Sequence, residues 1–127
     1  PMLRNLDTGV LERTTMGGTL AMLLNAGPLM DRMAQLSFEA NTLVVGSSAN
    51  LSLQGTKFCV EDIEQEVIDA ADLVIDYGLM RWANYKKSST MINVHDFSVV
   101  RYGSCFDLIS DILRRHFDIT LPAPESG

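Results

Sequence analysis

The chain has 127 residues, of which 46% are hydrophobic and 20% are charged. This length suits one domain, and the balance is typical of a folded globular protein and not of a disordered one. No apolar run approaches the ~20 residues of a transmembrane helix, and no signal-peptide pattern opens the chain, so we expect a cytoplasmic protein without a membrane anchor. The net charge of −6 argues against broad, sequence-independent nucleic-acid binding.

The cysteines and histidines are isolated from one another. Cys59 and Cys105 have no Cys or His at metal-ligand spacing, which favours a reducing compartment and two small buried thiols. His95 and His116 are equally solitary, so surface or structural roles suit them better than catalysis or metal binding. We therefore predict no protein-liganded metal and can name no catalytic residue.

The first part of the chain alternates between helix and strand signals. The glycine pair at 17–18 predicts a turn, and the apolar run over 19–24 is typical of a strand covered on both faces. Pro28 is well placed to begin a helix that continues over 29–38, and a second apolar strand follows over 42–45. Four apolar residues near the N-terminus fit one helical face: Leu3, Leu6, Val10 and Leu11.

The middle of the chain continues this alternation. An amphipathic helix is predicted over 61–71, with acids in its first turn and a buried stripe that includes Ile63 and Val67. A short strand follows over 73–75. The polar segment 81–87 then carries the single tryptophan and two lysines, and it suits either a mobile lid or plain surface.

The last part of the chain reads as a hairpin followed by a helix. Residues 89–101 predict two strands joined by a turn near Asp96, and Ser104 with Asp107 resembles a capping box. The helix that follows runs to about Phe117 and has one apolar face. The order of elements predicts an α/β domain, a mixed sheet with flanking helices over 1–121, and a disordered tail over 122–127.

Polar side chains stand at three expected strand ends. These are Thr19, the segment 47–52 and the segment 88–90 together with Arg101. Hydroxyls and an arginine at the ends of strands suit recognition of a carboxylate or phosphate. The competing interpretations are a turn with a helix N-cap for 47–52, a solvent-facing start of a strand for 88–89 and a surface salt bridge for Arg101. P-loop, Rossmann and hydrolase-elbow motifs are all missing from the sequence.

Four short motifs resemble those of the YrdC-like family, in the family's order and at similar separations. They are Ser-Ser-Ala-Asn-Leu-Ser over 47–52, Ala-Asp-Leu-Val-Ile-Asp-Tyr-Gly over 71–78, Ser-Ser-Thr-Met-Ile-Asn over 88–93 and Val-Val-Arg-Tyr-Gly over 99–103. The resemblance spans nearly the whole chain. It implies a twisted mixed α/β sheet around a large cavity.

The resemblance also implies a function. The family's best-known activity is L-threonylcarbamoyl-AMP synthesis from ATP, L-threonine and bicarbonate, with release of pyrophosphate, in the service of tRNA modification. By motif match Thr19, Ser48 and Asn50 would face the nucleotide. Ser89 would contact the threonine end of the cavity, and Arg101 would hold a phosphate or carboxylate. ATP is then a substrate, with Mg²⁺ as its companion, and catalysis relies on positioning and charge stabilisation.

Three departures from the family pattern shape these expectations. The basic K-x-R motif of the family's N-terminal half is missing, Leu23 stands where an arginine of the threonine site is usual, and Leu53 replaces a glycine. We therefore expect the C-terminal portion of a divergent YrdC-like domain, inactive alone, which either dimerises or belongs to a longer chain. The alternative is a non-catalytic nucleotide- or RNA-binding module of the same fold.

Overall fold

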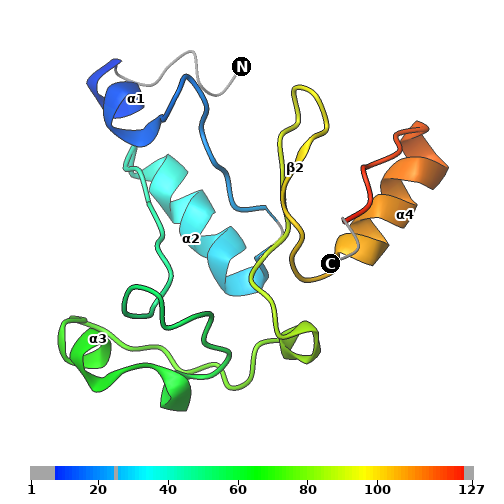
Figure 1. The fold of residues 1–127 in the computed structure, drawn as a ribbon. Coiled ribbons are helices and arrows are strands. Elements are labelled where there is room, and N and C mark those ends of the chain that lie inside the picture. The colour runs from blue at the N-terminus through cyan, green and yellow to red at the C-terminus, as the bar shows by residue number, and fades with distance from the viewer. Residues whose placement is uncertain (1–7, 25, 125–127) are drawn as a thin grey trace. The chain divides into compact units, whose positions relative to one another are not determined.

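The computed structural model describes residues 8–24 and 26–124, and the chain divides into two compact units, Pro1–Gly46 and Ser47–Gly127 (Figure 1). Across the described ranges the regular structure consists of four α-helices, two 3₁₀ turns and a two-stranded antiparallel hairpin. The protein is thus mostly helical, with a hairpin. Every helix in these ranges is too short or too polar to cross a bilayer.

The first unit contains helices α1 (Thr8–Thr14) and α2 (Pro28–Glu39). Pro28 occupies the first turn of α2, as the sequence predicts, because its fixed φ suits the helix and its missing N–H needs no partner there. The predicted glycine turn is also confirmed, since the backbones of Met16 and Thr19 exchange hydrogen bonds of 3.0 and 3.1 Å around it. Leu3 and Leu6, predicted on a helical face, lie outside the described residues.

Three segments expected to be strands do not form them. The described residues of 19–24, 42–45 and 73–75 take no part in a β-ladder, so no twisted mixed sheet is present in this part of the chain. Most of their apolar side chains are exposed, with Leu23 at 65%, while Leu20 is half-buried. A doubly apolar strand depends on neighbours that pair with both of its edges and cover both faces. The described residues supply no such neighbours.

The second unit begins with the turn η2 (Val60–Asp62) and the helix α3 (Gln65–Asp69). The helix predicted over 61–71 is therefore present only in part. Ile63 and Glu64 have extended ψ angles of 135° and 137°, which interrupt the helical path between the two pieces. Glu64 is held instead by contacts outside the helix, an ion pair with Lys57 and a 3.3 Å hydrogen bond from the Leu51 N–H.

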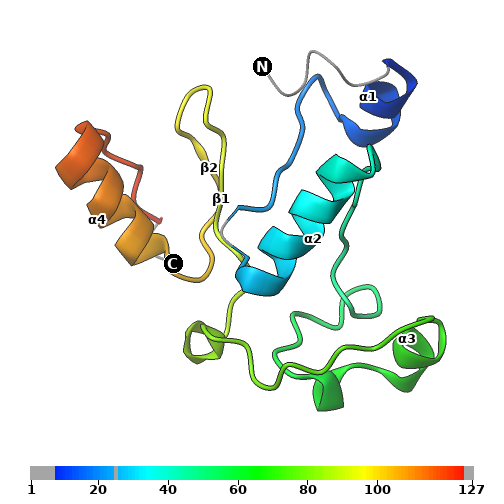
Figure 2. The ribbon, with the colours of Figure 1, turned by 180° about the vertical axis from the view of Figure 1, so that it is seen from behind.

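The predicted hairpin is confirmed. Strands β1 (Met91–Ile92) and β2 (Val99–Arg101) pair antiparallel, with Met91 opposite Arg101 and a register irregularity after Met91 (Figure 2). The turn closes through hydrogen bonds from the Asn93 N–H to the Ser98 carbonyl and from the Phe97 N–H to the Asn93 carbonyl. Asp96 orders it further, because its carboxylate accepts from both the N–H and the hydroxyl of Ser98.

The turn η3 (Ala83–Tyr85) precedes the hairpin, and the final helix, α4 (Phe106–Phe117), follows it. The predicted capping box is wrong. Cys105 is the N-cap, with a left-handed φ of 59° and no side-chain cap bond, while the hydroxyl of Ser104 donates to the Lys87 carbonyl. The hydroxyl expected to cap the helix is therefore bonded to a carbonyl 17 residues earlier in the same chain.

Large apolar side chains remain in contact with solvent throughout the described ranges. Leu121, 5% exposed, is the one buried hydrophobic residue among them. The apolar face of α4 was expected to bury Phe106, Ile109, Ile112 or Leu113, and Phe117; Ile112 and Phe117 are exposed and the others are half-buried. Among the described elements of the second unit, the backbones of β1 and β2 lie against each other. Hairpin pairing and local turns, not a shared core, therefore position the site described below.

Candidate functional site

Two chain segments come close together where residues 87–90 meet residues 103–104. The Ser104 N–H donates to the Ser88 carbonyl at 2.7 Å, and the Thr90 hydroxyl donates to the Ser104 carbonyl at 2.8 Å. The same hydroxyl oxygen accepts from the Gly103 N–H at 3.2 Å. One threonine therefore joins both segments, and the third and fourth sequence motifs meet here.

Gly103 is required at this junction for steric reasons. A Cβ atom on Gly103 would lie 2.2 Å from the Ser88 carbonyl oxygen and about as close to backbone atoms of Ser89 and Thr90. Backbone cannot rotate away as a flexible side chain can, so the two segments pack this closely only because residue 103 lacks a side chain.

Arg101 and Ser89 lie together beside this junction. The Arg101 Nε donates to the Ser89 backbone carbonyl at 2.7 Å. The expected surface salt bridge is absent, because no carboxylate within the described ranges pairs with Arg101. The two terminal nitrogens of this exposed side chain make no hydrogen bond within the described ranges, and their planar donor geometry suits a phosphate or carboxylate.

Ser48 and Asn50 form a separate part of the second unit. Asn50 donates from its side-chain amide to the Leu51 carbonyl at 2.7 Å, while the exposed Ser48 hydroxyl has no hydrogen-bond partner in the described part of the chain. No interaction joins either residue to Ser89 or Arg101. The segment also lacks the preceding strand that would have fixed its position.

Thr19 belongs to the first unit and has a local role. Its hydroxyl donates to the Met16 carbonyl at 2.7 Å, which closes the glycine turn. A threonine engaged in this way is a turn residue in this structure, and its predicted contact with a nucleotide stays a prediction.

An apolar hollow of about 200 Å³ adjoins α3. Ala49, which stands between Ser48 and Asn50, lines it together with residues of η2, α3 and the segment after α3. The other lining residues are Val60, Ile63, Val67, Ile68, Ala71, Leu73, Val74 and Ile75. The predicted buried stripe of Ile63 and Val67 thus borders a hollow, and both residues are half-buried.

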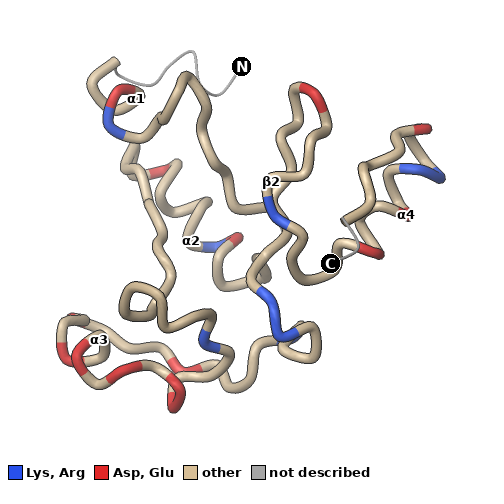
Figure 3. Tube along the Cα trace, in the orientation of Figure 1, with Lys and Arg blue, Asp and Glu red and all other residues tan. Residues whose placement is uncertain are grey.

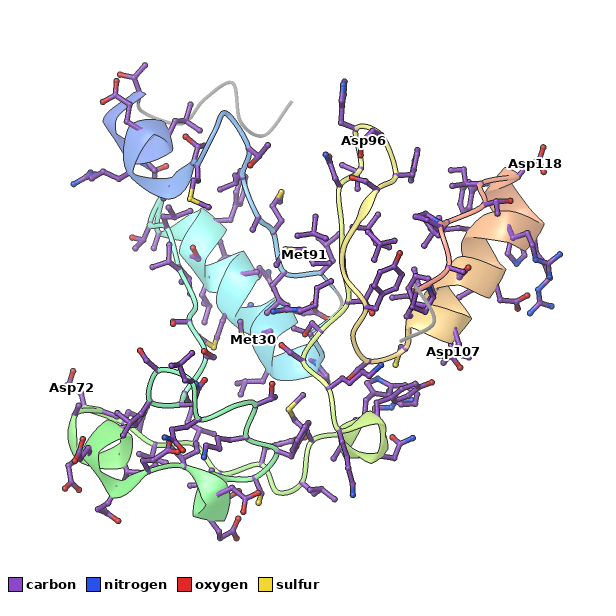
Figure 4. The ribbon with its side chains drawn as sticks, viewed as in Figure 1. Met30, Asp72, Met91, Asp96, Asp107 and Asp118 are labelled. Carbon is purple, nitrogen blue, oxygen red and sulfur yellow. The ribbon has the colours of Figure 1, made fainter. Side chains whose placement is uncertain are left out.

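The segment 79–87 gathers aromatic and basic groups. The Arg81 guanidinium lies 5.0 Å from the centre of the Trp82 ring, and Trp82 meets Tyr85 edge to face at 6.3 Å. The Tyr85 hydroxyl donates to Asp107 of α4 at 2.8 Å (Figure 4). This bond to a carboxylate raises the pKa of Tyr85 to about 12, because it holds the proton on the phenol. Tyr85 is thus a fixed donor and not a base.

Neither cysteine has the features of a nucleophile. The Cys59 thiol donates to Asp62 at 3.0 Å, and this bond raises its pKa to about 11. Burial raises the pKa of the Cys105 thiol, with a further contribution from the nearby Asp107 charge. Both thiols are free and half-buried, where the sequence predicted full burial. No group of three or more Cys, His, Asp or Glu side chains gathers as a metal site in the ranges described.

Sequence reasoning missed three residues that build the junction. The sequence places Thr90 in a polar group at a strand end and Gly103 in a motif, and it predicts a helix cap at Ser104, but it indicates no contact among the three. The missing information is the register of the hairpin, which brings residues 14 and 17 positions apart within hydrogen-bond distance. Hydroxyl residues flanking both ends of a predicted hairpin were the available signal.

Comparison with protein-family models, with curated proteins and with solved structures finds no match to this chain.

Proposed function

We propose that this protein is a divergent YrdC-like nucleotidyltransferase that makes a threonylcarbamoyl-adenylate, or a close analogue, from ATP, an L-threonine-like acid and bicarbonate. The one observation that supports this most is the pairing of the third and fourth motifs in the hairpin, which joins Ser89 to Arg101. Two motifs that must cooperate in an anion site are adjacent in space although they are separate in sequence.

The chemistry follows from how Arg101 is held. Its Nε is bound by the Ser89 carbonyl, so the guanidinium plane is oriented before a ligand arrives. Its terminal nitrogens can then donate two parallel hydrogen bonds to one phosphate or carboxylate. Such a preorganised donor stabilises charge on a transferring phosphoryl group without a protein nucleophile, which fits thiols held in their protonated form.

The remaining parts of the site belong to the same proposal. By the same resemblance Ser48 and Asn50 contact the nucleotide, and Mg²⁺ accompanies the ATP phosphates. The chain has no K-x-R motif, so further basic residues complete the domain, from a longer chain or from a second copy. With them present, the segments 19–24, 42–45 and 73–75 become strands of the twisted mixed sheet.

The proposal is tested by pyrophosphate release and ATP binding. The full native protein is assayed with ATP and bicarbonate, with and without L-threonine, and ATP affinity is measured by calorimetry for the wild type, Arg101→Gln and Arg114→Gln. Arg114 is the matched control because it is exposed and pairs with Asp111 on α4. We expect threonine-dependent pyrophosphate release, and an ATP affinity reduced about tenfold or more by Arg101→Gln alone.

Different results separate the alternatives. ATP binding that depends on Arg101 without pyrophosphate release, whichever amino acid is added, identifies a nucleotide-binding module. No ATP binding by the full protein, or equal losses in both arginine variants, contradicts the proposed site. Ser89→Ala gives a further check, because it removes the hydroxyl while keeping the backbone carbonyl that anchors Arg101.

A further inference from the structure

The surface around the apolar hollow is strongly acidic. Residues 58–80 contain seven acids and no lysine or arginine: Glu61, Asp62, Glu64, Glu66, Asp69, Asp72 and Asp76. Glu64 is paired with Lys57, and the others alternate along the chain with the residues that line the hollow. Figure 3 shows this concentration of acidic residues around α3, and Figure 4 labels Asp72 there. The hollow is thus an apolar centre within an acidic surround.

The segment 79–87 has the complementary character. It carries Arg81, Lys86 and Lys87, and the stretch from residue 77 to residue 95 contains no acid. Leu79 is 70% exposed and Trp82 is 39% exposed, so apolar and basic groups alternate on one exposed segment. A segment of this composition matches an apolar hollow surrounded by carboxylates in both hydrophobicity and charge.

The segment does not fill the hollow of its own chain. The Met80 N–H donates to the Phe58 carbonyl at 2.8 Å, which fixes where the segment begins within the second unit. Within that unit, Figures 1 and 2 both place η3, which contains Tyr85, away from α3. Within the second unit, neither of these complementary surfaces therefore covers the other.

We propose that the hollow beside α3 receives the segment 79–87 of a second copy of this chain. The contact is reciprocal in a two-fold dimer, because each copy offers one hollow and one segment. Leu79 and Trp82 supply the apolar groups that enter the hollow. Lys86 and Lys87 face the carboxylates, among them Glu66 and Asp72.

Charge reversal tests this pairing by analytical ultracentrifugation. The double variant Lys86→Glu with Lys87→Glu weakens self-association about tenfold or more, since it places acids opposite acids. The double variant Glu66→Lys with Asp72→Lys does the same, and mixing the two variants restores association as a heterodimer. Arg114→Glu with Arg115→Glu is the matched control, an adjacent basic pair outside the proposed contact, and it leaves association unchanged.

Several outcomes would overturn the proposal. They are a wild-type protein that stays monomeric at every concentration tested, a dimer indifferent to both reversals, and variants that fail to restore each other. Leu79→Ser gives an independent arm, because this exposed side chain is not needed for folding and its loss weakens a contact that uses it. The measurement involves no nucleotide, so its failure leaves the proposed ATP site standing, and failure of ATP binding leaves the dimer standing.

Discussion

The two motif-bearing regions of the second unit are built in different ways. Residues 88–104 form a hairpin whose ends are joined by hydrogen bonds through Thr90 and Ser104 and by the Arg101 bond to Ser89. Residues 47–54 have a few local bonds and one tie to α3, the Leu51 N–H to Glu64. In the first region the chain supplies its own partner. In the second region, the strand expected before the motif has no segment to pair with among the described residues.

The separation in sequence between a motif and its pairing partner therefore controls whether the motif acquires a defined geometry. A hairpin closes a short loop, so little chain entropy is lost before its hydrogen bonds form. The strand end that would position Ser48 depends on pairing with distant segments. The part of the candidate site with a defined geometry is therefore Arg101 with Ser89. The following changes test the difference between the two regions.

The largest expected effect comes from Gly103→Ala. The added Cβ would meet the Ser88 carbonyl oxygen at 2.2 Å, so the junction must open, at a cost of about 1–3 kcal/mol in the free energy of unfolding. Gly46→Ala is the matched control, since a Cβ there meets nothing within 4 Å and its φ is not in the left-handed region. Urea unfolding of both variants measures the difference. Equal stabilities would mean that the junction does not constrain the folded state.

A smaller loss is expected for Thr90→Val. This change keeps the shape of the side chain but removes the hydroxyl that donates to Ser104 and accepts from Gly103. Leaving these part-buried partners unmatched costs about 1 kcal/mol by urea unfolding. Thr56→Val is the control, because Thr56 is exposed and its hydroxyl makes no hydrogen bond in the described part of the chain. A larger effect at Thr56 would contradict the contrast between the two regions.

The smallest effect concerns the exposed bond from Tyr85 to Asp107, which joins the segments on either side of the hairpin. The pKa of Tyr85 is raised to about 12 in the folded protein, above the value of about 10 for an unfolded chain. The stabilisation by this bond is complete below pH ~10 and is lost as the pH rises through about 12. Asp107→Asn therefore lowers the pKa of Tyr85.

Tyrosinate absorbance during an alkaline titration measures this change, and Tyr85→Phe identifies which signal belongs to Tyr85. Asp118→Asn is the control, a carboxylate at the other end of α4. A Tyr85 pKa that is the same in the wild type and in Asp107→Asn would show that the hydrogen bond is not formed in solution.

Local pattern was sufficient for several elements of the fold. Pro28 marked the start of α2, the apolar period marked α4, and the turn around Asp96 marked the hairpin. The predicted strands over 19–24, 42–45 and 73–75 failed for a common reason. An apolar run indicates that other residues must cover the segment on both faces, but it does not show which residues do so.

The candidate site divides along the same line. The resemblance to family motifs led to Arg101 and Ser89, which the hairpin brings together. It also led to Ser48 and Asn50, which remain apart from them, and to Thr19, whose hydroxyl closes a turn. The ligand for these residues stays a prediction.

The residue pattern alone specifies the helices α2 and α4 and the hairpin, because each depends on residues close together in the chain. It also shows that acids concentrate around α3 and bases over 79–87. Tertiary structure alone decided that Ser104 bonds to the Lys87 carbonyl instead of capping α4, and that Gly103 lies against the Ser88 backbone. Those contacts depend on hairpin register, which the geometry of the turn fixes and which the residue pattern alone does not reveal.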